Sequence, residues 1–128
     1  MKNKTSKVAV VARCIFWTAL ILLCIFCNTP IIIGDSMAPT LNNGEIHLSA
    51  KYAEPEVGDI VFFRLPNQKK VFVKRIVAGP GEKVEYWEKL RTLGDDEYFV
   101  LGDNREISLD SRGFGPIHRE DIIGVLIF

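Results

Sequence analysis

The chain has 128 residues, and its 16 basic and 16 acidic side chains give a formal net charge of zero. That balance hides an asymmetry, because the first 33 residues carry a charge of +4 and the rest of the chain carries −4. An acidic domain without a basic stripe excludes nucleic acid as an expected partner, and its length allows one small core rather than two.

An apolar segment follows the basic start of the chain. Residues 8–28 are almost continuously apolar and long enough for one helix to cross a bilayer, and Pro30 favours a helix end just before it. We expect a basic N-terminus over residues 1–7, a transmembrane anchor over 8–28 and one domain over 29–128. A cleaved secretory leader is the alternative, but small residues at −3 and −1 before a plausible cleavage point are missing. The basic start places the N-terminus in the cytoplasm and the domain outside it.

The domain is predicted to be mostly β, as a small antiparallel folded sheet or partial barrel. Its apolar residues alternate with polar ones or run continuously for a few positions, and Gly, Pro, Asn and Asp separate these runs without a convincing helical period. The expected strands cover residues 45–51, 60–65, 70–78, 83–88, 97–101 and 121–128.

Metal and cofactor chemistry are not expected. All three cysteines lie in the apolar segment, so the domain has no thiolate ligand and no disulfide. The two histidines, His47 and His118, stand in no metal-ligand spacing, and we interpret them as ordinary surface or half-buried residues. We therefore expect neither a metal nor another cofactor.

A serine lies shortly after the apolar segment, in the stretch Gly-Asp-Ser-Met-Ala-Pro-Thr-Leu over residues 34–41. Ser36 is a poor nucleophile unless a base removes its proton. The nucleophile elbow of α/β-hydrolases is excluded, because the chain is too short and Pro39 stands where the helix would begin. The S-x-x-K signature of penicillin-recognising enzymes is excluded as well, because the residue three positions after Ser36 is Pro39 and not a lysine. Taken alone, the stretch is equally well a connector between anchor and domain.

Lys74 is the candidate base. It lies in the middle of an expected strand, and the two-residue period places Phe72 and Ile76 on its face. Burial among apolar side chains lowers the pKa of a lysine toward neutrality, so that it can accept a proton. A lysine on an edge strand that discourages aggregation is the alternative, and the strand alone leaves both interpretations open.

A third candidate region is the stretch Gly-Asp-Asn-Arg-Glu-Ile-Ser-Leu-Asp-Ser-Arg-Gly over residues 102–113. It combines turn-forming residues with carboxylates, guanidinium groups and hydroxyls. Such a loop can support an active site through Asp–Arg pairs and hydroxyl hydrogen bonds, or it can be a solvated loop.

Four blocks of this sequence together resemble the bacterial type I signal peptidases. They cover residues 36–41, 58–61, 74–82 and 102–115, and they occur in the order of that family at compatible separations. With the anchor, the resemblance covers nearly the whole chain. It implies a membrane-bound serine endopeptidase of the cytoplasmic membrane that removes N-terminal signal peptides from exported precursors and cuts after small residues at −1 and −3.

The resemblance also implies roles for individual residues. Ser36 matches the nucleophile, Lys74 matches the general base, and the Ser36 backbone N–H forms part of an oxyanion hole. Ser108 matches the serine that hydrogen-bonds and orients the lysine. The residues that match the structural support of the site are Asp103, Arg105, Asp110 and Arg112.

The expected partners are precursors that carry a signal peptide, and the lipid bilayer. The residues that flank the Ser–Lys pair in sequence are the expected walls of a substrate pocket, namely Ile32, Ile33, Met37 and Val73. Exposed aromatic side chains among Phe62, Phe63 and Trp87 are expected to rest on the bilayer surface.

One departure from the family leaves the range of substrates open. Many signal peptidases insert a second β-domain between the lysine block and the last block, and here only 28 residues lie between Lys74 and Asp103. A peptidase specialised for pilin precursors in conjugation is therefore an alternative, as is an inactive membrane-tethered paralogue that acts as a binding subunit. A self-cleaving repressor-type Ser–Lys protease fits less well, because the chain has an anchor and no DNA-binding domain.

Overall fold

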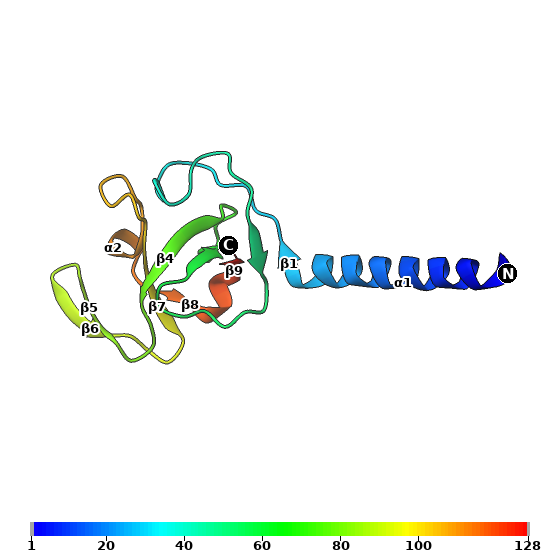
Figure 1. Ribbon diagram of the computed structural model, residues 1–128. Helices are drawn as coiled ribbons and strands as arrows, with labels where there is room; N and C mark the ends of the chain where they lie inside the picture. The colour runs from blue at the N-terminus through cyan, green and yellow to red at the C-terminus, as the bar shows by residue number, and fades with distance from the viewer. Residues whose placement is uncertain (1, 128) are drawn as a thin grey trace.

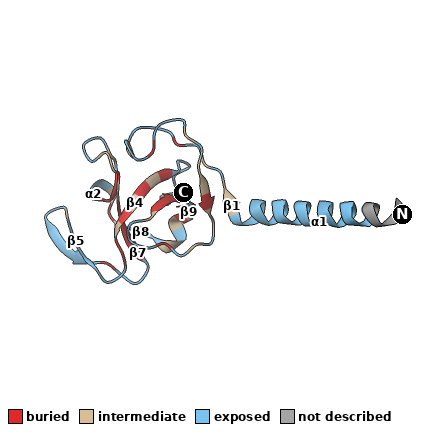
Figure 2. Ribbon diagram, in the orientation of Figure 1, coloured by how far each residue is buried: buried red, intermediate tan, exposed pale blue. Residues whose placement is uncertain are grey.

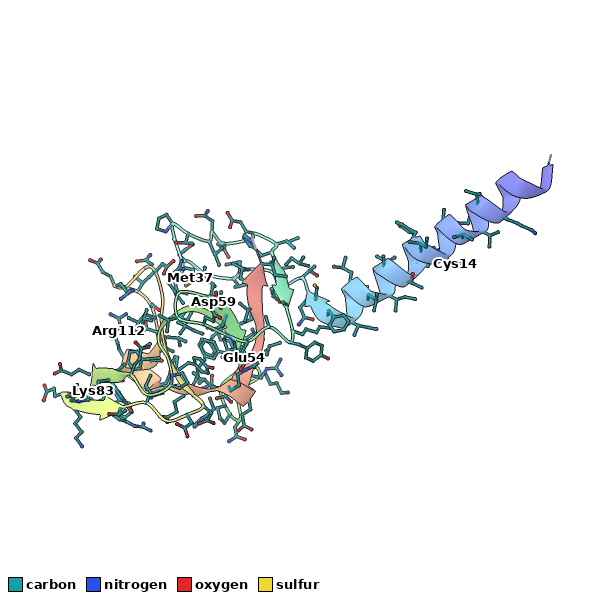
Figure 3. All side chains as sticks on the ribbon, turned by 60° about the horizontal axis from the view of Figure 1, so that its bottom comes forward. Cys14, Met37, Glu54, Asp59, Lys83 and Arg112 are labelled. Carbon is teal, nitrogen blue, oxygen red and sulfur yellow. The ribbon has the colours of Figure 1, made fainter. Side chains whose placement is uncertain are left out.

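In the computed structural model, one long helix projects from a β-rich domain (Figure 1). The structure describes residues 2–127, with side chains described from residue 7 onward. Helix α1 spans Lys2–Phe26, and its segment Lys7–Phe26 is long and apolar enough to cross a membrane, with none of it buried by the domain. Figure 3 shows the side chains of α1, Cys14 among them, projecting from a helix that no other element covers. Thr18 is the one polar residue between Cys14 and Phe26, and its hydroxyl donates to the Cys14 carbonyl oxygen at 2.9 Å.

The domain is mostly β, as the sequence predicts. Seven strands form one antiparallel sheet in the order β1-β2-β9-β3-β4-β7-β8, and β5 and β6 form a separate hairpin. The strands are β1 (Cys27–Asn28), β2 (Leu48–Ala50), β3 (Ile60–Phe63), β4 (Phe72–Ala78), β5 (Lys83–Tyr86), β6 (Lys89–Thr92), β7 (Glu97–Leu101), β8 (Ile117–His118) and β9 (Ile122–Ile127). A short helix α2 (Ser111–Phe114) and a 3-10 turn η1 (Arg119–Asp121) lie between β7 and β9. Register shifts in the β3–β9 and β4–β7 pairs bend the sheet into a curled half-barrel.

Strand β3 is buried on both faces, which explains its continuous apolar sequence Ile-Val-Phe-Phe. Val61 and Phe63 belong to a core cluster with Ile76 of β4 and Val125 of β9. The alternate residues Ile60 and Phe62 belong to a second cluster, which also contains Met37 and Leu41 from the serine stretch. Figure 2 shows the buried residues concentrated in these central strands. The serine stretch is therefore packed onto the sheet and is not a free connector.

The expectation that aromatic residues near the site rest on the bilayer is wrong for Phe62 and Phe63. Their side chains are 2% and 0% exposed, because β3 lies at the centre of the sheet and carries apolar neighbours on both sides. Trp87 is 62% exposed, but it forms the turn of the β5–β6 hairpin, which lies at the end of the domain opposite α1 (Figure 1).

The helix ends at Phe26, and the next two residues join the sheet of the domain. Cys27 and Asn28 form β1 and pair with Ala50 and Ser49 of β2. Of the expected strand over residues 45–51, only Leu48–Ala50 is a strand, while Ile46 forms an isolated bridge with Ile31. Helix α1 therefore continues without a flexible linker into the residues that lead to Ser36.

Candidate active site

Ser36 lies in a tight turn at the end of the paired segment that follows the anchor. The turn is closed by a hydrogen bond from the Ala38 N–H to the Asp35 carbonyl oxygen at 3.1 Å, and by one from the Leu41 N–H to the Met37 carbonyl oxygen at 3.0 Å. Met37 and Leu41 are 1% and 0% exposed, so these two apolar side chains fix the turn in the core while Ser36 stays half-buried at the surface.

Lys74 lies opposite this serine, in the middle of β4. Burial alternates along the strand, and Phe72, Lys74 and Ile76 share its buried face, as the two-residue period predicts. The Lys74 side chain is 3% exposed, and its Nζ donates to Ser36 Oγ at 2.6 Å and to the Val73 carbonyl oxygen at 2.9 Å. The structure therefore brings together two residues that lie 38 positions apart in the chain.

The environment of Lys74 favours its neutral form. Burial lowers the pKa of Lys74 from 10.5 to about 8, and the positive charge of Lys70 lowers it further, while the carboxylate of Asp110 acts in the opposite direction. Burial dominates because an ammonium group loses its hydration when it is enclosed by apolar atoms. Roughly a tenth of the Lys74 side chains are therefore neutral at pH 7, and about half at pH 8.

The loop after β7 holds the backbone of Ser36 in place. The Asn104 N–H donates to the Ser36 carbonyl oxygen at 3.0 Å, and the Asn104 side chain donates to the Asp35 carbonyl oxygen at 3.2 Å. At Gly102, a Cβ atom would overlap the Ser108 side chain and lie 2.6 Å from the Ser36 carbonyl oxygen. Only glycine allows this close approach of the two backbones.

Asp110 is the central acceptor of this loop. It is 1% exposed, caps the N-terminus of α2, and accepts hydrogen bonds from Arg112 Nε and Nη2 at 2.9 Å each and from the Gly102 N–H at 3.1 Å. Burial would raise the pKa of Asp110, but the bonds from Arg112 and Gly102 outweigh that effect and lower it. Asp110 is therefore an anion that ties α2 to the start of the loop. Figure 3 shows Arg112 on the ribbon of this region.

Asp103 pairs with Arg75 of β4. Its two carboxylate oxygens accept bonds from Arg75 Nε at 2.9 Å and from Arg75 Nη2 at 2.7 Å, and Arg75 Nη1 donates to the Gly58 carbonyl oxygen at 2.8 Å. The side-chain hydrogen bond from Arg75 is the main cause that lowers the pKa of Asp103. Arg105 instead contributes its backbone, since its carbonyl oxygen accepts from Arg112 Nη2 at 2.6 Å.

Ser108 lies next to the Ser–Lys pair without the expected bond to the lysine. Its hydroxyl is buried and forms no hydrogen bond of ordinary geometry among the residues that the structure describes, although it lies close enough to the Asp110 carboxylate to help lower the pKa of Asp110. The Cβ position of Gly102 borders this hydroxyl, so Ser108 packs beneath the Ser36 backbone.

A cleft of about 650 Å³ opens at Ser36 and Lys74. One wall is the continuous segment 30–37 that leads from the anchor, and the other is the segment 70–74. The expected pocket residues Ile32, Ile33, Met37 and Val73 all line this cleft, although Ile32 and Met37 are almost fully buried and Ile33 is 87% exposed. The exposed side chains of Ile107 and Leu109 border it as well.

The residues that sequence reasoning missed are Gly102, Asn104 and Arg75. All three lie in the blocks that carry the family resemblance, but their spacing does not predict which residue each of them contacts. Arg75 neighbours Lys74 and therefore points to the other face of β4, where it reaches Asp103 28 positions later. Among residues 2–127, the structure has no cluster of His, Cys, Asp or Glu that could hold a metal ion.

The chain matches the family described as signal peptidase, peptidase S26, over residues 4–91 and 87–128. It is similar to signal peptidase IB of Staphylococcus aureus, with 31% identity over 80% of this chain and 78% of that protein. It is similar to signal peptidase I P of Bacillus subtilis subsp. natto, with 32% identity over 74% of this chain and 72% of that protein. It is also similar to the chloroplastic thylakoidal processing peptidase 1 of Arabidopsis thaliana, with 32% identity over 76% of this chain but only 40% of that protein. The chain therefore belongs to the signal peptidase family, peptidase S26.

Proposed function

We propose that this protein is a membrane-anchored serine endopeptidase that removes signal peptides from exported precursors, with Ser36 as nucleophile and Lys74 as general base. The contact of 2.6 Å between Lys74 Nζ and Ser36 Oγ, made by a lysine that is 3% exposed, carries this proposal. The lysine has no carboxylate within hydrogen-bonding distance in the described chain, so no direct ion pair stabilises its charged form. A neutral amine at this position can accept the serine proton.

The reaction runs in two stages. In the first, Ser36 Oγ attacks the carbonyl carbon of the scissile bond while its proton passes to the neutral Nζ of Lys74. The tetrahedral intermediate then expels the amine, which takes that proton from Lys74, and an ester to Ser36 remains. In the second stage Lys74 removes a proton from a water molecule that attacks the ester, and the released Ser36 oxygen recovers the proton.

The oxyanion of each intermediate needs hydrogen-bond donors that are already in place. The Ser36 backbone N–H is the donor that we assign, since it forms no hydrogen bond within residues 2–127. Gly34 offers no side-chain hydroxyl as a second donor. The bonds from Asn104 to the carbonyl oxygens of Asp35 and Ser36 support this assignment, because they hold the peptide unit that carries the donor.

The two walls of the cleft suit an extended peptide with small side chains. The apolar residues Ile32, Ile33, Met37 and Val73 leave shallow apolar surface beside Ser36, which fits small residues at −1 and −3 of a precursor. The basic N-terminus supports an orientation with the start of α1 in the cytoplasm and the domain on the outer side of the cytoplasmic membrane. There the cleft meets a precursor whose own apolar segment still lies in the bilayer.

The test is cleavage of a precursor with an Ala-x-Ala site by the purified full-length protein in detergent, beside the variants Ser36→Ala and Lys74→Ala. We expect cleavage by the parent at that site and a loss of at least a thousandfold in either variant. Unimpaired cleavage by Lys74→Ala would remove the lysine from the mechanism. A parent that binds the precursor but leaves it intact would instead identify an inactive binding subunit.

A further inference from the structure

The Ser–Lys cleft contains a positive charge that the proposed mechanism does not use. Lys70 lines the cleft at the start of the wall formed by residues 70–74, and Lys74 lies at the other end of that wall. The Lys70 ammonium group lies 5.1 Å from the centre of the Phe72 ring. This contact of a cation with an aromatic face keeps the exposed Lys70 side chain beside the cleft wall.

The charge of Lys70 is not neutralised by the protein. Three residues that line the cleft have ionisable side chains, namely Asp35, Lys70 and Lys74. No salt bridge to Lys70 is formed within the described part of the chain, and Asp35 lies on the opposite wall, directly before Ser36. Because Lys74 acts as a base in its neutral form, Lys70 is the other basic side chain among the residues that line the cleft.

From this arrangement we infer that Lys70 determines part of the substrate specificity. It makes the cleft favour precursors that carry an acidic side chain on the segment bound along residues 70–74. Precursors with a basic side chain on that segment are disfavoured. The inference rests on the proposed function, since it describes the substrate of the same cleft. An extended peptide advances about 3.3 Å per residue, as the wall does, so the selected side chain lies roughly four residues from the scissile bond. An ion pair at an exposed site changes binding by roughly two- to fivefold.

Lys70 has a second effect at the other end of the wall. Its charge adds to burial in lowering the pKa of Lys74, whereas Asp110 on the loop after β7 raises it. Replacement of Lys70 by a neutral residue therefore raises the pKa of Lys74 and moves the acidic limb of kcat/KM to higher pH. Asp110 and Asp35 are unchanged in such a variant, so the shift reports the charge of Lys70 alone.

The test uses the full-length protein in detergent and peptides that share one Ala-x-Ala site. Each peptide carries a single Glu, Gln or Lys at the fourth, fifth or sixth residue before the scissile bond, which leaves the Ala-x-Ala site intact, or at the third, fourth or fifth residue after it. The enzymes are the parent, Lys70→Gln, Lys70→Glu and the matched control Lys69→Gln. Lys69 is exposed and does not line the cleft, so its replacement changes the net charge equally without changing the cleft.

We expect the parent to cleave the Glu peptide two- to fivefold better than the Lys peptide on one side of the scissile bond. The preference disappears in Lys70→Gln, inverts in Lys70→Glu and persists in Lys69→Gln, and it weakens as salt screens the charges. Equal cleavage of Glu and Lys peptides by the parent at every position overturns the inference. So does a preference that survives in Lys70→Gln.

A binding measurement separates this inference from the proposed function. Fluorescence anisotropy gives the affinity of the labelled Glu and Lys peptides for Ser36→Ala and for the double variant Ser36→Ala, Lys70→Gln. If the parent cleaves no peptide, the proposed function fails, but a Glu preference that depends on Lys70 still supports the charged subsite. Equal affinities in both proteins reject the subsite even if the parent cleaves.

Discussion

The burial that would make Lys74 a base also destabilises the folded domain. The neutral amine that a Ser–Lys mechanism requires is obtained by burial, which lowers the pKa of Lys74 to about 8 in the folded protein. In the unfolded chain the pKa returns to 10.5, so at neutral pH the folded state must hold a partly dehydrated ammonium group or release its proton. Other residues of the core compensate for this cost.

We therefore expect Lys74→Met to abolish cleavage and to stabilise the domain. The difference between the two pKa values corresponds to a destabilisation of about 3 kcal/mol by Lys74 below pH 8. The parent gains stability as the pH rises from about 8 to 10.5, because over that interval the unfolded state binds more protons than the folded state. Lys74→Met lacks this rise.

Chemical unfolding of the parent and the variant, followed by circular dichroism between pH 6.5 and 10.5, checks the prediction. Lys69→Met is the control, since Lys69 is exposed and its substitution leaves the buried site intact. Identical pH dependence of parent and Lys74→Met would show that the lysine is not desolvated in the folded protein.

The loop between β7 and β8, which contains α2, connects the proposed nucleophile to the strand that carries the proposed base. It holds Ser36 through Asn104, holds β4 through the Arg75–Asp103 pair, and is itself closed by Asp110. Its short helix α2 spans one turn, so the carboxylate at its N-cap contributes much of its stability. A substitution of Asp110 therefore affects both the stability of the loop and the charge near Lys74.

Replacement of Asp110 by alanine removes the acceptor for Arg112 and for the buried Gly102 N–H, and we expect a loss of about 3 kcal/mol in the free energy of unfolding. Asp110→Asn keeps an acceptor oxygen at this position, so we expect a smaller loss in the free energy of unfolding. Because the negative charge of Asp110 raises the pKa of Lys74, Asp110→Asn also moves the acidic limb of kcat/KM to lower pH. A limb that moves to higher pH in this variant would contradict the assignment.

The sequence predicted best those strands whose apolar and polar residues alternate regularly. The alternation along residues 70–78 predicted the buried face of β4 correctly, because a strand with one apolar face leaves that signature. Strand β6 was not expected, since its four residues are all exposed and only hairpin pairing with β5 holds them extended. The roles of Gly102 and Asn104 were not predictable, because they depend on a backbone contact with Ser36, which is more than 60 positions away.

At the scale of the whole molecule, helix α1 and the sheet form one continuous structure. Lys51 lies against the end of α1, where its N–H donates to the Phe26 carbonyl oxygen at 2.9 Å and its Nζ donates to the Cys24 carbonyl oxygen at 3.1 Å. The ring of Phe26 packs edge-to-face on Tyr52 at 5.8 Å. Together with the β1–β2 pairing, these contacts fix the direction in which the domain leaves the helix.

Insertion of Gly-Ser-Gly-Ser between Phe26 and Cys27 should separate the helix from the domain while β1 stays in the sheet. We expect cleavage of a precursor embedded in the same vesicles to fall about tenfold, because the cleft loses its fixed position at the bilayer. Cleavage of a short peptide in detergent should be unchanged. The same insertion between Trp87 and Glu88, at the hairpin turn, is the control; equal loss in both variants would contradict the prediction.

The segment between the anchor and Ser36 is hydrogen-bonded along its length to the segment 43–50. The Ile32 N–H donates to the Glu45 carbonyl oxygen, the Gly44 N–H donates to the Ile32 carbonyl oxygen, and the Gly34 N–H donates to the Asn43 side chain. The nine residues between Phe26 and Ser36 span at most about 30 Å when extended, so Ser36 lies within that distance of the end of α1. If α1 spans the membrane as proposed, bonds after small residues that lie farther than this distance from the bilayer should escape cleavage. On the proposed function, the length of this hydrogen-bonded segment would limit which bonds reach Ser36, independently of any recognition by side chains.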